Sequence, residues 1–90
     1  MSLPREERPA AIRAMLESAL APDSLDVGDD SHGHAGARDG RGHFKVSIVS
    51  RAFAGLAPLA RHRKVYAALG PLMQSDIHAL SIQARTPDET

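Results

Sequence analysis

The sequence predicts a small α+β domain whose elements follow the order helix, strand, strand, helix, helix, strand (αββααβ). Apolar residues recur every three to four positions in two parts of the chain, a pattern typical of amphipathic helices. They alternate with polar residues in three other parts, which is typical of strands with one covered face. The 90 residues include only two Phe, one Tyr and no Trp, so the chain can bury one thin, mainly aliphatic core. We therefore expect a single domain over residues 1–90.

The first helix is predicted over about 9–21. Ile12, Leu16 and Leu20 lie on one side of such a helix because they are four residues apart. Pro9 falls in the first turn, where its missing N–H group leaves no helical hydrogen bond unmade.

Two strands follow, at 25–29 and 44–50, and both show alternation of apolar and polar residues. The second strand places Phe44 and Ile48 on a covered side and polar residues on a solvent side. Between the strands, 31–42 contains four glycines, two histidines and no large apolar residue. This composition predicts a mobile connecting loop, so the two strands should form a hairpin with a long loop.

Helical spacing returns over 56–73 and predicts a short helix, a bend and a longer helix that ends at about Met73. Pro71 interrupts this pattern because it lacks an N–H group and clashes with the carbonyl of the residue four positions earlier. We therefore expect a kink or an early end near Gly70.

The last strand is predicted over 77–85, and simple alternation places His78 on the same face as Leu80 and Ile82. A position on the same face as core residues predicts that the His78 imidazole is half-buried and makes one hydrogen bond. Residues 86–90 are polar and are expected to form a frayed tail.

Charge is balanced overall and uneven along the chain. Eleven basic and eleven acidic residues cancel, but none of the acidic residues lies between Gly40 and Ser75, where six basic residues fall within 41–64. This stretch indicates either an anionic partner or a solvated surface over which the acidic ends fold back. The chain has no cysteine, no apolar run near the roughly 20 residues of a membrane span and no signal-like N-terminus. We therefore expect a cytoplasmic protein without a membrane partner.

No Gly-x-Ser-x-Gly, Walker or Rossmann motif occurs, and no pair of histidines is followed by a carboxylate at catalytic spacing, which predicts a protein that is not an enzyme and has no catalytic residues. Histidines are the main candidates for chemistry. His32 and His34 are two residues apart, so in an extended segment they could chelate nickel, copper or zinc, and otherwise they are ordinary solvated side chains. His43 faces away from its neighbour Phe44 and is expected to be exposed.

Arg61, Arg63 and Lys64 are predicted to begin the longer helix, where they could meet a phosphate or an acidic surface. The segment 33–36 matches the Gly-x-x-Gly loop of nucleic-acid-binding KH domains as a string. It follows a strand instead of joining two helices, so we interpret the match as accidental.

Several segments together resemble the BolA family in order and spacing, over essentially the whole chain. One segment differs from the family pattern: this chain has Gly70-Pro71 where the family usually continues a polar helix. The matching segments are Asp29-Asp-Ser-His32, His34-Ala-Gly36, His43-Phe-Lys-Val, Val49-Ser50, Phe53-x-Gly55, Arg61-His-Arg-x-Val-Tyr66 and Ile77-His-Ala-Leu-Ser-Ile-Gln-Ala-Arg-Thr-Pro87.

The resemblance implies a three-stranded mixed sheet with helices on one face, similar to a type II KH domain. It also implies a non-enzymatic partner of a monothiol glutaredoxin in iron–sulfur assembly, trafficking or iron sensing. In such complexes a 2Fe–2S cluster is shared between a glutaredoxin cysteine, a glutathione thiol and two ligands of the BolA-like protein. Those ligands correspond to His78 and His34, and His32 or His43 is close enough in sequence to replace His34. The isolated protein is then expected to carry no cofactor, and Arg61, Arg63 and Lys64 become a docking surface or a fold-supporting helix start.

Two other functions stay open. Family members have been described as transcriptional regulators, and the basic stretch 41–64 could contact DNA weakly and without sequence specificity. A simple His-x-His carrier of zinc or copper is the third possibility.

Overall fold

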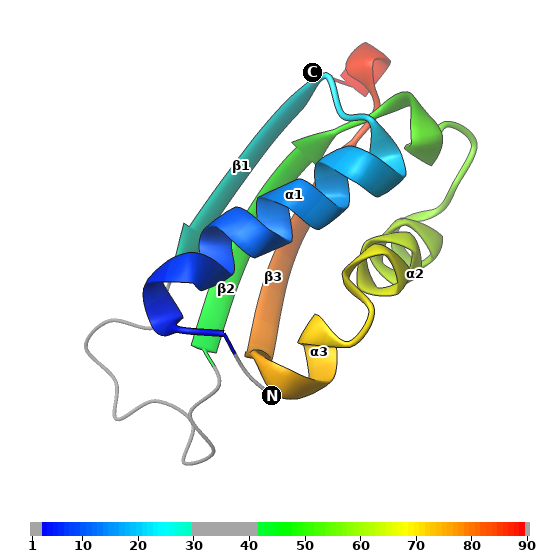
Figure 1. Ribbon diagram of the computed structural model, residues 1–90. Coiled ribbons are helices and arrows are strands. Elements are labelled where there is room, and N and C mark those ends of the chain that lie inside the picture. Colours follow the sequence, from blue (N-terminus) through cyan, green and yellow to red (C-terminus); the bar gives the residue numbers. More distant parts are fainter. Residues whose placement is uncertain (1–2, 30–41, 90) are drawn as a thin grey trace.

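The computed structural model describes residues 3–29 and 42–89 (Figure 1). The predicted order of the main helices and strands is confirmed, and one-turn 3-10 helices are added between and beyond them. Most of the predicted mobile loop falls on residues 30–41, which lie outside the described residues. The elements are η1 (Arg5–Glu7), α1 (Arg8–Leu20), β1 (Ser24–Asp29), β2 (Gly42–Val49), η2 (Arg51–Phe53), α2 (Pro58–Leu69), α3 (Leu72–Ser75), β3 (Ile77–Arg85) and η3 (Pro87–Glu89).

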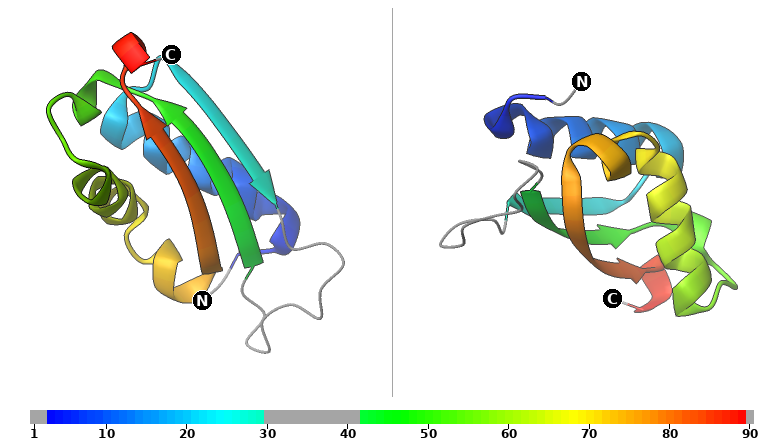
Figure 2. Two further views of the ribbon diagram at one scale, coloured as in Figure 1. Left: turned by 180° about the vertical axis from the view of Figure 1, so that it is seen from behind. Right: turned by 90° about the horizontal axis from the view of Figure 1, so that it is seen from below.

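The three strands form one mixed sheet in the order β1-β2-β3. β1 and β2 are antiparallel, whereas β2 and β3 are parallel and are joined through the helices α2 and α3. Figures 1 and 2 show α1 and α2 on the same face of the sheet. That face carries Phe44, Val46 and Ile48, which are buried in the alternation expected for β2. No helix of the described residues covers the opposite face of the sheet.

α1 begins and ends one residue earlier than predicted. Ile12, Leu16 and Leu20 are buried against the sheet, because a spacing of four residues keeps them on one side of the helix. The helix ends at Leu20 and is capped by Ala21, whose backbone is left-handed (φ 43°) and whose N–H donates to the carbonyl of Glu17 at 3.2 Å.

The long helix of the second half differs from the prediction. It occupies Pro58–Leu69 and is followed by the short α3, so the bend comes after the long helix instead of before it. The expected early end near Gly70 is confirmed: Gly70 has φ 52° and its N–H donates to the carbonyl of Tyr66 at 3.0 Å. Pro71 directly afterwards cannot continue the helix.

The chain end beyond β3 is ordered by contacts that local sequence does not reveal, so the expectation of a frayed tail over the described residues 86–89 was wrong. Thr86 is buried, and Pro87–Glu89 forms the turn η3. Glu89 accepts hydrogen bonds from the backbone N–H of Thr86 at 3.0 Å and from both terminal nitrogens of Arg61 at 2.6 and 2.8 Å. These bonds tie the end of the chain to α2.

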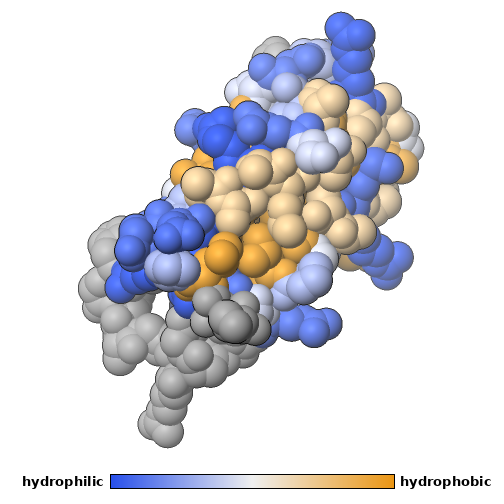
Figure 3. Space-filling view, in the orientation of Figure 1, coloured by the Kyte–Doolittle hydropathy of each residue, from blue (hydrophilic) through white to orange (hydrophobic). Residues whose placement is uncertain are grey.

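The core is aliphatic apart from Phe44 and Phe53, as the composition predicted, while the Tyr66 ring reaches solvent. Figure 3 shows the helical side of the molecule, where apolar side chains reach the surface over the helices. Met15 on α1 and Leu59 on α2 are exposed members of this group.

Candidate functional site

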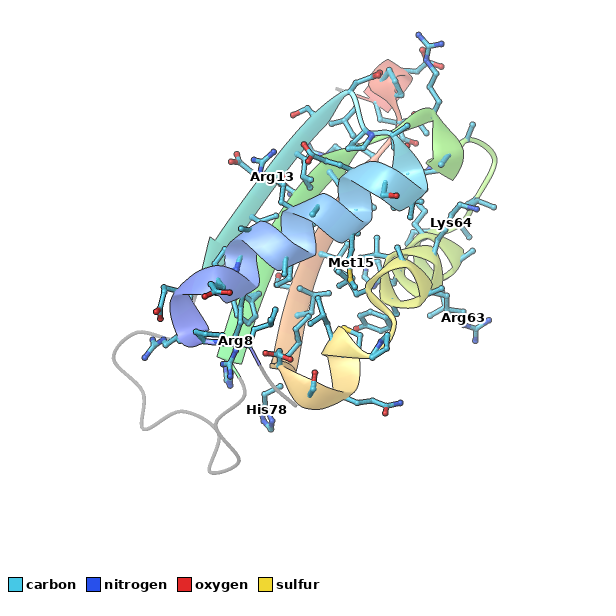
Figure 4. All side chains as sticks on the ribbon, in the orientation of Figure 1. Arg8, Arg13, Met15, Arg63, Lys64 and His78 are labelled. Atoms are coloured by element: carbon cyan, nitrogen blue, oxygen red, sulfur yellow. The ribbon has the colours of Figure 1, made fainter. Side chains whose placement is uncertain are left out.

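Two histidines lie together at the end of the sheet where β2 and β3 begin. His43 and His78 are each the second residue of their strand, and their ring centroids are 5.2 Å apart with an interplanar angle of 18°. Figure 4 shows His78 projecting beyond this end of the sheet, away from α1. The structure therefore stacks two imidazoles that are far apart in the sequence.

A register shift between β2 and β3 produces this arrangement. Gly42 pairs with Ile77, and the next residue of β2, His43, pairs with Ala79, so His78 is one extra residue in β3. The extra residue lets Ile77 and Leu80, three positions apart, both turn toward the core. The prediction that His78 shares the core face was wrong for this reason, and its side chain is exposed.

His43 lies on the side of β2 opposite to Phe44, as expected, but it is half-buried instead of fully exposed. The stack on His78 covers part of its ring. His32 and His34 lie outside the described residues, so their expected role as loop ligands stays a prediction.

A buried carboxylate, Asp76, lies two residues before His78 at the same end of the sheet. Asp76 is 1% exposed and accepts hydrogen bonds from the backbone N–H of Leu3 at 2.7 Å, from Arg8 Nε at 3.0 Å and from the hydroxyl of Ser75. Its backbone carbonyl accepts the N–H of Gly42 at 2.9 Å. One residue thus joins the N-terminal segment, α3 and the first residue of β2.

The charge on Asp76 is retained despite its burial. Burial raises the pKa of this carboxyl, but hydrogen bonds from Ser75, from the Leu3 N–H and from Arg8, with the positive charge of Arg8, lower it more. The pKa of Asp76 therefore lies below its ordinary value. Asp76 and Arg8 form a buried ion pair, with side-chain exposures of 2% and 8%. Sequence reasoning missed this pair, because a single Asp before a strand and a single Arg at a helix start carry no local signal of contact.

The donor set at the sheet end suits a shared metal site. Within the described residues, no group of three or more His, Asp or Glu side chains could hold a metal ion, and the sequence contains no cysteine. The exposed His78 carries an imidazole, which is a good ligand for iron, and one or two imidazoles would leave the other coordination positions of an iron to ligands from another molecule. The residues present therefore fit a cluster held jointly with a partner.

The three predicted basic docking residues have different surroundings. Because α2 begins at Pro58, Arg61 is not at the helix start, and its N–H already donates to the carbonyl of Ala57 at 3.1 Å. Its guanidinium donates to the carbonyls of Leu56 and Ala84 at 2.8 and 3.1 Å, in addition to its bonds to Glu89. These contacts assign Arg61 to support of the fold.

The Arg61–Glu89 pair is electrostatically favourable for both partners. The hydrogen bond to Glu89 raises the pKa of Arg61, and the hydrogen bond from Arg61, with that from the Thr86 N–H, lowers the pKa of Glu89 to about 2. Arg63 and Lys64, by contrast, are exposed on α2 and form no ion pair with any other described residue (Figure 4). Of the three predicted docking residues, Arg63 and Lys64 are therefore the two whose charges stay exposed to solvent.

A hollow of about 490 Å³ lies on the uncovered face of the sheet, away from the histidines. Gly28, Ser47 and Ser81, one small residue from each strand, line it together with the exposed Lys45. The hollow and the histidine pair are separate features.

The order of elements, the mixed sheet and the stacked histidines define a small α+β domain with two imidazoles at one end of its sheet. The family model "BolA-like protein" matches residues 16–89. The chain therefore belongs to the BolA-like family.

Three relatives illustrate the likeness. BolA-like protein 1 of Homo sapiens is 51% identical over 78 residues, which cover 87% of this chain and 57% of that protein, so the chain spans somewhat over half of the relative's length. The DNA-binding transcriptional regulator BolA of Vibrio cholerae is 41% identical over 87% of this chain and 74% of its own length. The solved structure of the BolA domain of SufE1 from Arabidopsis thaliana is 43% identical, with a TM-score of 0.85 over 99% of this chain and all of that one.

Within residues 3–29 and 42–89, no helix combines the length and the apolar character needed to cross a membrane.

Proposed function

We propose that this chain is a non-enzymatic partner of a monothiol glutaredoxin and that it contributes histidine ligands to a shared 2Fe–2S cluster. The observation that carries the proposal is the exposed His78, placed at the beginning of β3 and stacked on His43. Membership of the BolA-like family supports the same function. When bound, the cluster supplies electron-transfer or delivery chemistry that the side chains of this protein do not supply.

The division of ligands follows from the composition. Clusters of this type are held mainly by thiolates, and this chain has none, so the thiolates come from the glutaredoxin and from glutathione. Imidazoles can replace thiolates on one of the two irons, and the reduction potential then rises. We assign one of these imidazoles to His78. The second is His34 by resemblance, with His32 and His43 as substitutes.

The test is a titration of the protein with cluster-loaded monothiol glutaredoxin and glutathione, followed by visible absorbance and circular dichroism. The wild-type protein should change the cluster spectrum. His78→Ala should abolish that change while leaving apo association with the glutaredoxin largely intact, and His34→Ala should weaken the mixed complex only in part. His62→Ala is the matched control, because His62 lies on α2, away from the histidine pair. A wild-type spectrum from His78→Ala would remove that residue from the site.

A second candidate function is weak DNA binding through the basic stretch. The exposed Arg63 and Lys64, and a Vibrio cholerae relative that is a DNA-binding transcriptional regulator, favour it. Arg61, by contrast, already holds Glu89 and two backbone carbonyls. We therefore propose only non-specific binding, at roughly 10⁻⁴ to 10⁻⁶ M at physiological salt. Nanomolar, sequence-selective binding that is lost in Arg63→Ala would reverse the order of the two proposals.

A further inference from the structure

The buried Asp76 connects four separate parts of the chain at the sheet end that carries the histidine pair. Its carboxylate accepts from Leu3, Arg8 and Ser75, and its carbonyl accepts from Gly42. These partners lie before α1, at the first residue of α1, in α3 and at the first residue of β2. This set of bonds ties the beginning of β3 to the N-terminal segment, α1, α3 and β2.

The position of these bonds coincides with the register shift. The Gly42–Asp76 backbone bond lies on one side of the shift, and the His43–Ala79 pairing lies on the other, so His78 occupies the interval between them. If the beginning of β3 moved by one residue, alternation along the strand would turn His78 toward the helices and away from His43. The direction of His78 therefore depends on what holds Asp76.

Stability alone gives a weak reason for a buried ion pair here. Two charges lose their hydration when they are buried, and an apolar pair of similar volume is often as stable. What the ion pair adds is directional: Arg8 reaches Asp76 from the first residue of α1, over a separation of 68 residues, with the donor Nε 3.0 Å from the carboxylate. An apolar contact at the same place would not select one strand register so strictly.

We propose that Arg8 and Asp76 form a positioning clamp that fixes the shifted register at the beginning of β3 and thereby holds His78 against His43, facing outward toward the partner. The expected effect of this clamp on cluster binding rests on the proposed function. Its structural part, the orientation of the two imidazoles, concerns the isolated protein alone. Neither Arg8 nor Asp76 is a ligand in this proposal.

The experiment compares Asp76→Asn and Arg8→Met with Ser50→Ala. Ser50 is a matched control because its buried hydroxyl ties β2 to α1 through the carbonyl of Leu20 at 2.6 Å, just beyond the opposite end of β2. Arg8→Met leaves Asp76 its bonds from Leu3 and Ser75, so this variant should fold even where Asp76→Asn does not. Denaturant titration confirms that each variant used is folded.

Two readouts separate the clamp from the proposed function. The first is the nuclear Overhauser contact between the His43 and His78 rings in the isolated protein, which should be largely lost in Asp76→Asn and Arg8→Met and kept in Ser50→Ala. The second is the titration with cluster-loaded glutaredoxin, in which loss of a residue that orients a ligand should weaken co-ligation about 10- to 100-fold. A merely structural role would lower stability equally in all three variants and leave both readouts unchanged.

Each outcome either supports or overturns the proposed clamp. Loss of the ring contact in the clamp variants, with the contact kept in Ser50→Ala, supports it. Folded clamp variants that keep the contact overturn it, and so does failure of both clamp variants to fold, because the pair is then a general folding determinant. A wild-type protein that keeps the ring contact and does not alter the cluster spectrum would overturn the proposed function and leave the clamp in place.

Discussion

Replacement of His43 by alanine tests whether this residue supports His78 or is itself a ligand. The two rings have centroids 5.2 Å apart and planes inclined by 18°, a stacked geometry. Aromatic pairs in such arrangements contribute about 0.5–1.5 kcal/mol beyond the area that they bury. That range corresponds to a factor of about 2 to 12 in a binding constant. Because His78 is exposed, we expect the lower part of the range, about threefold weaker co-ligation.

The assay is the midpoint of the circular-dichroism titration with cluster-loaded monothiol glutaredoxin and glutathione. His43→Ala should shift the midpoint and keep the final spectrum, because the freed His78 has to be ordered on binding but can still ligate. His78→Ala should lose the spectrum altogether, and His62→Ala should match the wild type. An unchanged midpoint in His43→Ala would refute the stacking argument. A loss as complete as that of His78→Ala would show that His43 ligates the cluster directly.

The other predictions concern stability and charge. Ser50→Ala should lower the free energy of unfolding by about 1–3 kcal/mol, measured by urea titration, because it leaves the Leu20 carbonyl without its buried donor; an unchanged unfolding midpoint would contradict this. Glu89→Gln should destabilise the protein at pH 7. The folded pKa of Glu89, about 2, lies below its ordinary 4.5, so the stabilisation by Arg61 is complete above the ordinary value and is lost as pH falls toward 2. Unfolding curves of the two proteins should therefore converge in acid, and a constant difference between pH 7 and pH 2 would argue against the ion pair. If DNA binding occurs, about four phosphate contacts should give a log–log salt slope near −3.6, and Arg63→Ala should reduce its magnitude by about 0.9. A slope that does not change in this variant would exclude Arg63 from the contact.

The sequence alone predicted the elements that depend on short-range pattern. Alternation placed the last strand at 77–85, as observed, and placed the other strands within two residues of their bounds. Helical spacing found α1 to within one residue at each end. Gly70 and Pro71 signalled the end of α2 because they restrict the backbone locally. The composition also limits the ligands that the chain can offer, because five histidines and no cysteine supply imidazoles but no thiolates.

Only the tertiary structure decided the geometry of the site. His43 and His78 are 35 residues apart, and the parallel pairing of β2 with β3 brings them together. The register shift turns His78 outward, against the alternation that its neighbours indicate, because burial of Ile77 and the Gly42–Asp76 bond outweigh the local pattern. Arg8–Asp76 and Arg61–Glu89 likewise join residues 68 and 28 positions apart. Periodicity reports which face of its own element a residue prefers. Partners at such separations are chosen by the packing of whole elements, and that choice is not encoded in any one segment.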